Sequence, residues 1–296
     1  MAALRKPNPE GAEVIPAWTR VQLGDATFAT LVRMVRESCG VAMSDFKKTM
    51  LETRLRRRLQ ATGLETFEDY VALLQKPDGW RQEGQNFVDA VVTNETSFFR
   101  ERAHFDHFTP AEIQRLLANG DGRGLHVWSA AASSGQEAYT MAMVLDSLSE
   151  GATRFDWSVL ATDISVKVLR MAREAVYRAE DVAPVPPALL DRYVLRSRDE
   201  ASGTVRIAPE LRQRVHFGQL NLMHAEYKPK RTMDVIFCRN VLIYFEPAVQ
   251  EQVVSKLARH VRPGGLLILG HSDSLRTKSL PLRLVGNNIY ERLGDR

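Results

Sequence analysis

Small and acidic residues stand where an α/β fold binds a nucleotide. An apolar segment, Leu125–Ala130, runs through small residues to Gly135, and Glu137 follows in the expected first turn of a helix. A second apolar segment ends at Asp163, where such folds place the carboxylate that binds ribose hydroxyls. Small residues let a ligand approach the backbone, and a helix start offers unpaired N–H groups. The spacing predicts a site for an adenosine-bearing cofactor.

The type of cofactor follows from what this turn lacks. A dinucleotide fingerprint needs three glycines, and only Gly135 is present. Glu137 would repel a diphosphate but suits a ligand with positive charge, which favours S-adenosylmethionine and makes a nicotinamide dehydrogenase the least consistent interpretation. The alternative is that Glu137 is only a helix-start acid favoured by the macrodipole.

Five segments then occur in the order found in one enzyme family. From about residue 25 to its end the chain resembles the chemotaxis-receptor glutamate O-methyltransferases of the CheR type, through segments 94–100, 128–139, 161–164, 221–222 and 237–245. It departs from the family pattern at Ser134, Ala138 and Asp273, where threonine, proline and glutamate are more usual. The resemblance implies a cytoplasmic enzyme that methylates glutamates of bacterial chemoreceptors with S-adenosylmethionine, leaving S-adenosylhomocysteine.

The resemblance also implies residue roles. Arg100 and Tyr244 would be catalytic. Arg100 would also bind the cofactor. The other cofactor-binding residues would be Asn94, Thr96, Ala130, Glu137, Asp163, Asn221, Leu222, Arg239 and Asn240. Two alternatives stay open, because Tyr244 could merely pack and Arg239 could be an ordinary ion-pair arginine.

Methyl transfer to a carboxylate requires no catalytic acid or base from the protein. A glutamate with a pKa near 4.3 is already ionised at pH 7, so neither a Ser-His-Asp relay nor a metal is needed. We therefore expect no metal site and no catalytic role for the seven histidines.

Length and composition set broad limits. The 296 residues, 44% of them hydrophobic, suffice for two domains with full cores, and no apolar run reaches the length of a membrane helix. Two cysteines without metal-ligand spacing and a net charge of +4 fit a reduced protein with an acidic protein partner or weak nucleic-acid affinity. We expect a monomer without membrane insertion.

The order of elements predicts a small all-α domain followed by a Rossmann-like class I methyltransferase sheet. We expect a flexible leader (1–22), the helical domain (23–92), a linker (93–106) and the methyltransferase domain (107–296) with an antiparallel β insertion at about 180–214. Helical periodicity predicts four helices in the helical domain, the third stopped before Pro77 and the fourth over about 85–92. Expected strands are 125–130, 157–162, 215–220, 233–238 and 265–270, with a turn at 263–265, a hairpin at 282–293, and helices near 137–149, 165–176 and 247–261.

The second helix of the helical domain carries aligned basic residues. These are Lys47, Arg54, Arg57 and Arg58, which fall within an arc of about 100°. Such an arc is either a solvated face or a docking surface, and the family resemblance favours docking on the glutamate-rich helical region of a receptor. The family's β insertion can also bind a tethering peptide from the receptor's C-terminus.

Two further functions remain as alternatives. One is a signalling adaptor that binds the cofactor without turnover. The other is a methyltransferase that acts on another protein or on a nucleic acid. The strand end Arg239–Leu242 disfavours a nucleic-acid substrate, because it lacks the proline-containing tetrad used on flipped bases. We therefore expect no nucleic-acid partner.

Overall fold

The chain forms two compact units. The computed structural model describes residues 21–120, 124–151, 154–273 and 280–294, so almost all of the expected leader lies outside the described residues. Residues up to 34 together with 44–91 form a helical unit, and residues 35–43 together with 92–296 form a sheet unit. A single boundary near residue 92 does not predict that residues 35–43 cluster with the sheet unit.

The helical unit is built from α1 (Asp25–Cys39) up to residue 34, a short 3-10 turn η2 (Asp45–Lys47), α2 (Lys48–Thr62), α3 (Phe67–Gln75) and α4 (Pro77–Val91). Leu51, Leu55 and Leu59 recur every four residues and are fully buried, as the helical periodicity predicts. The expected start of the fourth helix was wrong: α4 begins at Pro77, because the first helical position needs no N–H donor.

The sheet unit has seven strands in the order β6-β2-β1-β7-β8-β10-β9. β1 (Gly124–Ala130), β2 (Asp156–Asp163), β6 (Val215–Gln219), β7 (Met233–Cys238) and β8 (Val261–Leu269) are parallel, and the hairpin β9 (Leu282–Gly286) and β10 (Ile289–Arg292) joins β8 antiparallel. The expected strands and terminal hairpin are confirmed. β8 begins at Val261, and residues 263–265 form an irregularity within it instead of a turn before it.

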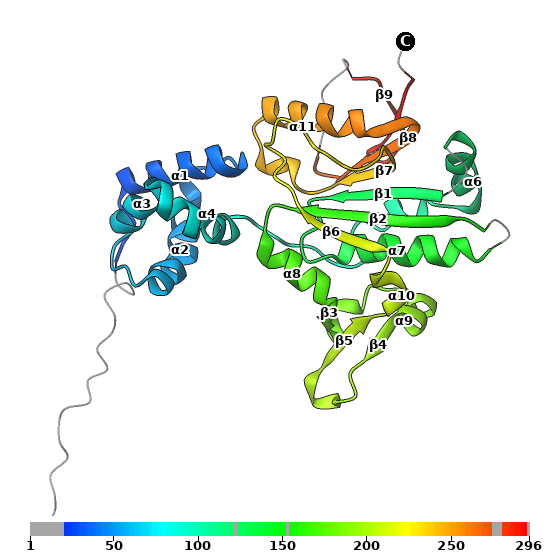
Figure 1. Ribbon diagram of the computed structural model, residues 1–296, viewed down its shortest axis with the longest axis horizontal. Helices are drawn as coiled ribbons and strands as arrows, with labels where there is room; N and C mark the ends of the chain where they lie inside the picture. The colour runs from blue at the N-terminus through cyan, green and yellow to red at the C-terminus, as the bar shows by residue number, and fades with distance from the viewer. Residues whose placement is uncertain (1–20, 121–123, 152–153, 274–279, 295–296) are drawn as a thin grey trace, which may run out of the picture. The chain divides into compact units, whose positions relative to one another are not determined.

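Helices cover both faces of this sheet, as the alternation of strands and helices predicts. α7 (Gln136–Ser149) and α8 (Val166–Glu174) lie on one side and α11 (Pro247–His260) on the other (Figure 1). Alternate side chains point to opposite faces, so Val127 and Phe237 join the core under α7 while Trp128 and Cys238 join the core under α11. Two shorter helices, α5 (Ala103–Asp106) and α6 (Pro110–Asn119), precede β1.

The expected antiparallel insertion is present as a three-stranded sheet in the order β3-β5-β4. Its strands are β3 (Val176–Arg178), β4 (Val194–Arg196) and β5 (Thr204–Ile207), so it starts a few residues before the predicted boundary. Segment 192–195 is only partly strand, because α9 (Pro187–Tyr193) starts on a proline and runs to Tyr193. The short helices η3 (Ala179–Val182), η4 (Glu200–Ser202) and α10 (Pro209–Arg212) complete the insertion.

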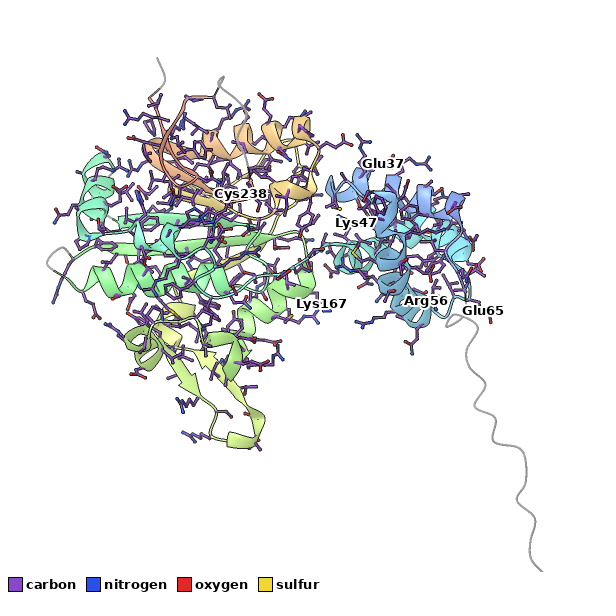
Figure 2. All side chains as sticks on the ribbon, turned by 180° about the vertical axis from the view of Figure 1, so that it is seen from behind. Glu37, Lys47, Arg56, Glu65, Lys167 and Cys238 are labelled. Atoms are coloured by element: carbon purple, nitrogen blue, oxygen red, sulfur yellow. The ribbon has the colours of Figure 1, made fainter. Side chains whose placement is uncertain are left out.

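Two further observations concern the described residues. None of their helices combines the length and the apolar character that a membrane crossing requires. Cys39 and Cys238 are both free and buried, and Figure 2 shows Cys238 inside the sheet unit.

Candidate functional site

The strand order places the site before any side chain is considered. From β1 the chain continues to β2 and β6 on one side, then crosses to β7 and β8 on the other. Ligands of open α/β sheets bind at the carboxyl ends of the strands where the order reverses. The switch point therefore lies where β1 ends at Ala130 and β7 ends at Cys238. The segments that follow these two strands carry the predicted site residues Glu137, Arg239, Asn240 and Tyr244.

The turn after β1 is held by Asp163 from the end of β2. One carboxylate oxygen of Asp163 accepts from the Ser133 backbone N–H at 2.8 Å, and the other accepts from the Ser165 N–H at 2.9 Å. Asp163 is buried, so these bonds fix its orientation at the sheet edge. Its predicted contact with ribose hydroxyls stays a prediction.

Gly135 serves this turn differently from the expectation. Its φ is +94°, and a Cβ at this position would lie 2.9 Å from the Ala172 Cβ of α8. The requirement for glycine therefore comes from the left-handed backbone and from close packing of α7 against α8.

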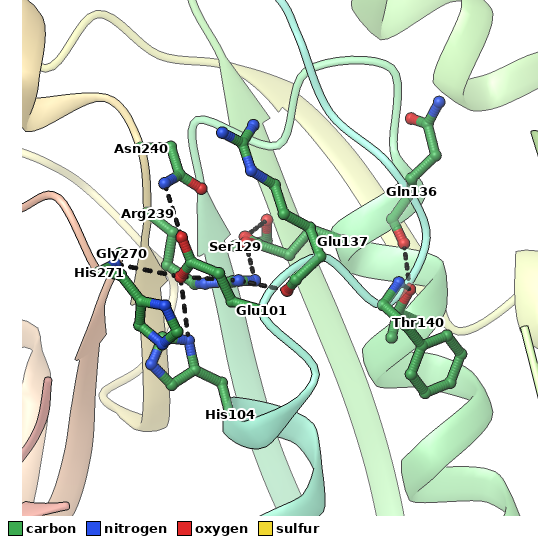
Figure 3. A network of polar contacts seen from close by, with 12 residues as sticks. Glu101, His104, Ser129, Gln136, Glu137, Thr140, Arg239, Asn240, Gly270 and His271 are labelled. Atoms are coloured by element: carbon green, nitrogen blue, oxygen red, sulfur yellow. Dashed lines mark hydrogen bonds and ion pairs between the residues drawn. The ribbon is translucent and has the colours of Figure 1, made fainter. Parts of the chain in front are cut away.

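A buried polar network lies beside the turn (Figure 3). The Arg239 side chain is only 1% exposed and forms ion pairs with Glu137 at 3.0 Å and Glu101 at 3.1 Å. The Arg239 amino group that pairs with Glu101 also donates to the Arg100 carbonyl, and Glu137 also accepts from the Ser129 hydroxyl at 2.6 Å. Glu137 is thus more than a helix-start acid, and Arg239 is in fact an ion-pair arginine. Direct contact of either with the cofactor stays a prediction.

Asn240 connects this network to the next segment. Its side-chain amide donates to Glu101 at 2.9 Å, and its backbone, at a φ of +56°, donates to Asp273 at 2.7 Å. Asp273 also accepts from the Gly270 and Ile243 N–H groups, so it holds the whole loop after β7. Burial raises the pKa of Asp273 despite these bonds, and the charge of Glu101 raises it further.

The linker residues reach the site from the other side. The Asn94 carbonyl accepts from the Ser133 hydroxyl at 2.7 Å, which joins the linker to the turn after β1. Thr96 and Arg100 are half-buried, and the Arg100 guanidinium donates to the Glu95 carbonyl at 2.9 Å. The catalytic role of Arg100 stays a prediction.

Three predicted residues belong to a second group, and residues 35–43 hold two of them, Asn221 and Tyr244. The Asn221 amide donates to the Ser38 carbonyl at 2.7 Å, and the Tyr244 carbonyl accepts from the Ala42 N–H at 2.8 Å. Leu222 is buried, and its carbonyl accepts from Tyr227 and Lys256. Tyr244 itself is half-buried in the short helix η5 (Leu242–Tyr244).

The basic arc of the helical unit needs correction. Lys47 lies in η2, before α2 begins (Figure 2), and Arg54 donates to the Val91 carbonyl at 2.8 Å. Arg58 makes a two-pronged contact with Glu83 at 2.7 and 2.8 Å, and the Glu83 side chain is 7% exposed. Arg58 therefore already pairs with a buried carboxylate, and its role in docking a partner stays a prediction. Arg57 alone of the four is classed as exposed.

Several site residues escaped the sequence analysis. Glu101 directly follows Arg100, yet a charged residue after an arginine carries no signal of burial by itself. Hydrogen bonds from Asn240 and Arg239 outweigh the effect of burial and hold the pKa of Glu101 below its usual value. Asp273 was noticed only as a departure from the family pattern, although that departure was a usable signal.

The charges around the network suit a cationic ligand. Glu101, Glu137 and Asp273 oppose the single guanidinium of Arg239, and small residues line the adjoining turn. This donor set fits the ammonium and sulfonium of S-adenosylmethionine, and would disfavour a diphosphate.

A cavity of about 1160 Å³ lies elsewhere in the sheet unit. It is lined by residues of β1, β2 and β6 and by segment 224–231. None of the predicted site residues lines it, so the strand order and the polar network, rather than this cavity, locate the site.

Comparison with known proteins shows which family the chain resembles over nearly its whole length. Residues 26–92 match the CheR methyltransferase all-alpha domain, and residues 94–290 match the CheR methyltransferase SAM binding domain. The chain is 35% identical over 291 residues to a chemotaxis protein methyltransferase of Salmonella typhimurium, covering 98% of each chain. It is 37% identical over 272 residues to one from Escherichia coli (92% of each chain) and 34% identical over 250 residues to one from Borreliella burgdorferi (83% of this chain, 87% of the other).

Proposed function

Because the chain belongs to the CheR methyltransferase family, we propose that it methylates glutamate side chains of a bacterial chemoreceptor. The matched SAM binding domain makes S-adenosylmethionine its cofactor. The observation that carries the proposal is the negatively charged network that Glu101 and Glu137 form around Arg239 at the switch point of the sheet. Such a network favours a cationic cofactor. The attacking nucleophile then comes from the substrate.

The bound cofactor supplies a methyl group activated by the sulfonium. Glu137 and Asp163 are already oriented by hydrogen bonds, so they bind the cofactor without first having to be ordered. Arg100 attracts the substrate carboxylate, and the Tyr244 hydroxyl positions its attacking oxygen. Holding that oxygen in line with the methyl group supplies up to about 7–11 kcal/mol of the rate acceleration.

Glutamate is the nucleophile that this arrangement fits best. Its carboxylate is ionised at neutral pH, so no residue has to remove a proton. An amine nucleophile is mostly protonated at neutral pH and would first have to lose a proton to a base. Carboxylate methylation therefore requires the fewest additional groups.

Two surfaces would bring the receptor to the site. In the helical unit, the exposed cation Arg57 would attract the acidic face of an amphipathic receptor helix. The exposed ring of Phe46, which is 98% accessible, would contact its apolar face. In the insertion, β4 pairs with β5 along one edge only and carries half-exposed Leu195, so an extended tethering peptide can add as a further strand.

The decisive experiment is transfer of a labelled methyl group onto receptor cytoplasmic fragments, followed by mild base. We expect label on the receptor that mild base releases as methanol, because carboxyl methyl esters hydrolyse and N-methyl groups do not. A receptor with its candidate glutamates replaced by alanine is the matched control. Base-stable label would contradict glutamate as the target, and cofactor binding without transfer to any receptor would indicate the adaptor.

The role of Tyr244 is separable from binding. Tyr244→Phe should lower kcat at least tenfold while the affinity for S-adenosylhomocysteine changes little, because the hydroxyl acts on the substrate oxygen. Calorimetry with S-adenosylhomocysteine and initial rates on the receptor measure the two effects. A variant that loses cofactor binding but keeps its turnover per bound site would place Tyr244 in the cofactor pocket.

A further inference from the structure

Two histidines and a glutamate meet at the edge of the polar network. Glu101, His104 and His271 each present one ligand atom, and these atoms all lie within 4.8 Å of one another (Figure 3). The Glu101 Oε2 and His104 Nδ1 atoms are 3.5 Å apart. A metal with bonds of 2.0–2.2 Å to two tetrahedral ligands separates those ligands by about 3.4 Å, so this pair already has the required spacing.

His104 has an unused nitrogen at this point. Its side chain is fully buried, and its Nε2 carries the proton because it donates to the Asn287 carbonyl at 2.8 Å. The Nδ1 atom is therefore unprotonated and carries a lone pair, and it has no hydrogen-bond partner.

The lone pair faces a carboxylate, which is unfavourable unless a cation lies between them. A buried acceptor without a donor costs about 1–3 kcal/mol. Glu101, Glu137 and Asp273 outnumber the Arg239 guanidinium nearby, so a divalent cation finds a net negative environment. His271 is exposed, and its ring can turn to complete the coordination.

We propose that Glu101, His104 and His271 form a Zn²⁺-binding site. Two imidazoles and one carboxylate are a ligand set that suits Zn²⁺, whereas Mg²⁺ prefers oxygen ligands. The site departs from the expectation, drawn from the sequence, that the protein binds no metal.

Metal binding competes with the contacts that order the cofactor site. Glu101 Oε2 is the same atom that accepts from Arg239 and from the His271 backbone N–H. Zn²⁺ on this oxygen weakens both bonds and adds positive charge beside the site for the cofactor's ammonium, a group that S-adenosylhomocysteine shares with S-adenosylmethionine. Zn²⁺ therefore antagonises the cofactor, a part of the inference that rests on the proposed function, and linkage requires the cofactor to weaken Zn²⁺ binding by the same factor.

The test is calorimetric titration of the full chain with Zn²⁺ in the absence of cofactor, supported by the visible spectrum of Co²⁺ in its place. We expect one Zn²⁺ per chain and a Co²⁺ spectrum typical of four- or five-coordinate nitrogen and oxygen ligation. His271→Ala removes an exposed ligand and should weaken Zn²⁺ binding by at least about tenfold, as even outer-sphere changes do. His224→Ala removes another histidine of the sheet unit and should leave the affinity unchanged.

A separate titration measures the antagonism. S-adenosylhomocysteine should bind more weakly with saturating Zn²⁺, and this effect should disappear in His271→Ala. Equal Zn²⁺ affinity in wild type and His271→Ala, or six-coordinate Co²⁺, would overturn the metal site. Tight Zn²⁺ binding with unchanged S-adenosylhomocysteine affinity would keep the site and overturn the antagonism. If the wild-type protein fails to bind S-adenosylhomocysteine when no metal is present, that result would instead count against the proposed function.

Discussion

Each unit of the protein contains a buried arginine–glutamate centre, and the two are built differently. In the helical unit Arg58 faces a single carboxylate, Glu83, which also accepts from Tyr70 and Asn86. In the sheet unit Arg239 is shared between Glu101 and Glu137, and its Nε atom has no partner. We call the Arg58–Glu83 pair the closed centre. We call the group of Arg239, Glu101 and Glu137 the open centre, because it has unused hydrogen-bonding capacity.

This difference separates stabilising a fold from positioning a site. Arg58 and Glu83 join α2 to α4, and every added bond makes the pair harder to rearrange. Arg239 instead orients two carboxylates that come from the linker and from α7, beside the segments that the cofactor must reach. A guanidinium between two acids can shift toward either one, which suits a site whose charge changes when a cation binds.

The largest expected effect is on the closed centre. Arg58→Ala should lower the free energy of unfolding of the helical unit by about 3 kcal/mol, because Glu83 stays buried without its cation. Hydrogen exchange of α2–α4 amides measures this loss. Arg57→Ala, one residue away and exposed, is the matched control and should stay within about 0.5 kcal/mol of wild type. Equal stability of both variants would show that Arg58 is a surface cation after all.

The open centre should respond mainly in ligand binding. Arg239→Gln should weaken S-adenosylhomocysteine binding by about tenfold, or 1.4 kcal/mol, because Glu137 loses the partner that orients it. Calorimetry on Arg239→Gln and Arg58→Ala makes the comparison direct, and the second variant should keep wild-type affinity where it is folded. If Arg239→Gln changes only stability, Arg239 is an ordinary ion-pair arginine.

Acid should act on the closed centre in a defined direction. Burial raises the pKa of Glu83, but hydrogen bonds from Arg58, Asn86 and Tyr70 outweigh it and leave the pKa below 4.5. The stability from ionised Glu83 is thus present above pH 4.5 and is lost as the pH falls through the lowered value. Glu83→Gln should be less stable than wild type at pH 7 but should lose less stability below pH 4.5. Denaturation followed at pH 7, 5 and 3.5 checks this, and parallel curves for both proteins would contradict it.

The smallest effect concerns the exposed cation of the helical unit. Arg57→Ala should raise the KM for an unmethylated receptor a few-fold, in line with the 1 kcal/mol or less of an exposed ion pair. The difference should shrink with added salt, since screening acts within about 8–10 Å at 0.1–0.15 M. Receptor KM measured against ionic strength tests it, and equal salt slopes would make Arg57 part of a solvated face.

Much of the fold could be predicted because local pattern and burial agree. The leucines of α2 and the apolar β7 have one way to be buried, so periodicity located them. Prolines were less informative: Pro77 was predicted only to stop the third helix, and in the structure it also begins the fourth. The assignment of residues 35–43 to the sheet unit depends on contacts far along the chain, which periodicity does not encode.

The candidate site was predicted unevenly for the same reason. Asp163 and Glu137 stand directly after a strand and at a helix start, where position alone implies a role. Glu101 and His271 acquire theirs only from tertiary packing, because nothing near them in sequence shows that they meet. The pairing of Arg58 with Glu83 could not be predicted, because helical spacing gives a residue's direction but not the neighbour it meets.

The attachment of residues 35–43 to the loop of Tyr244 has a consequence for folding order. Ser38 is bonded to Asn221 across 183 positions, and Arg36 pairs with Glu246 across 210. These segments emerge from the ribosome far apart in time, and bringing them together closes a long loop whose entropy no local contact offsets beforehand. We expect the sheet to form first and Tyr244 to settle late, so a chain begun at residue 93 would fold its strands yet leave this tyrosine unanchored.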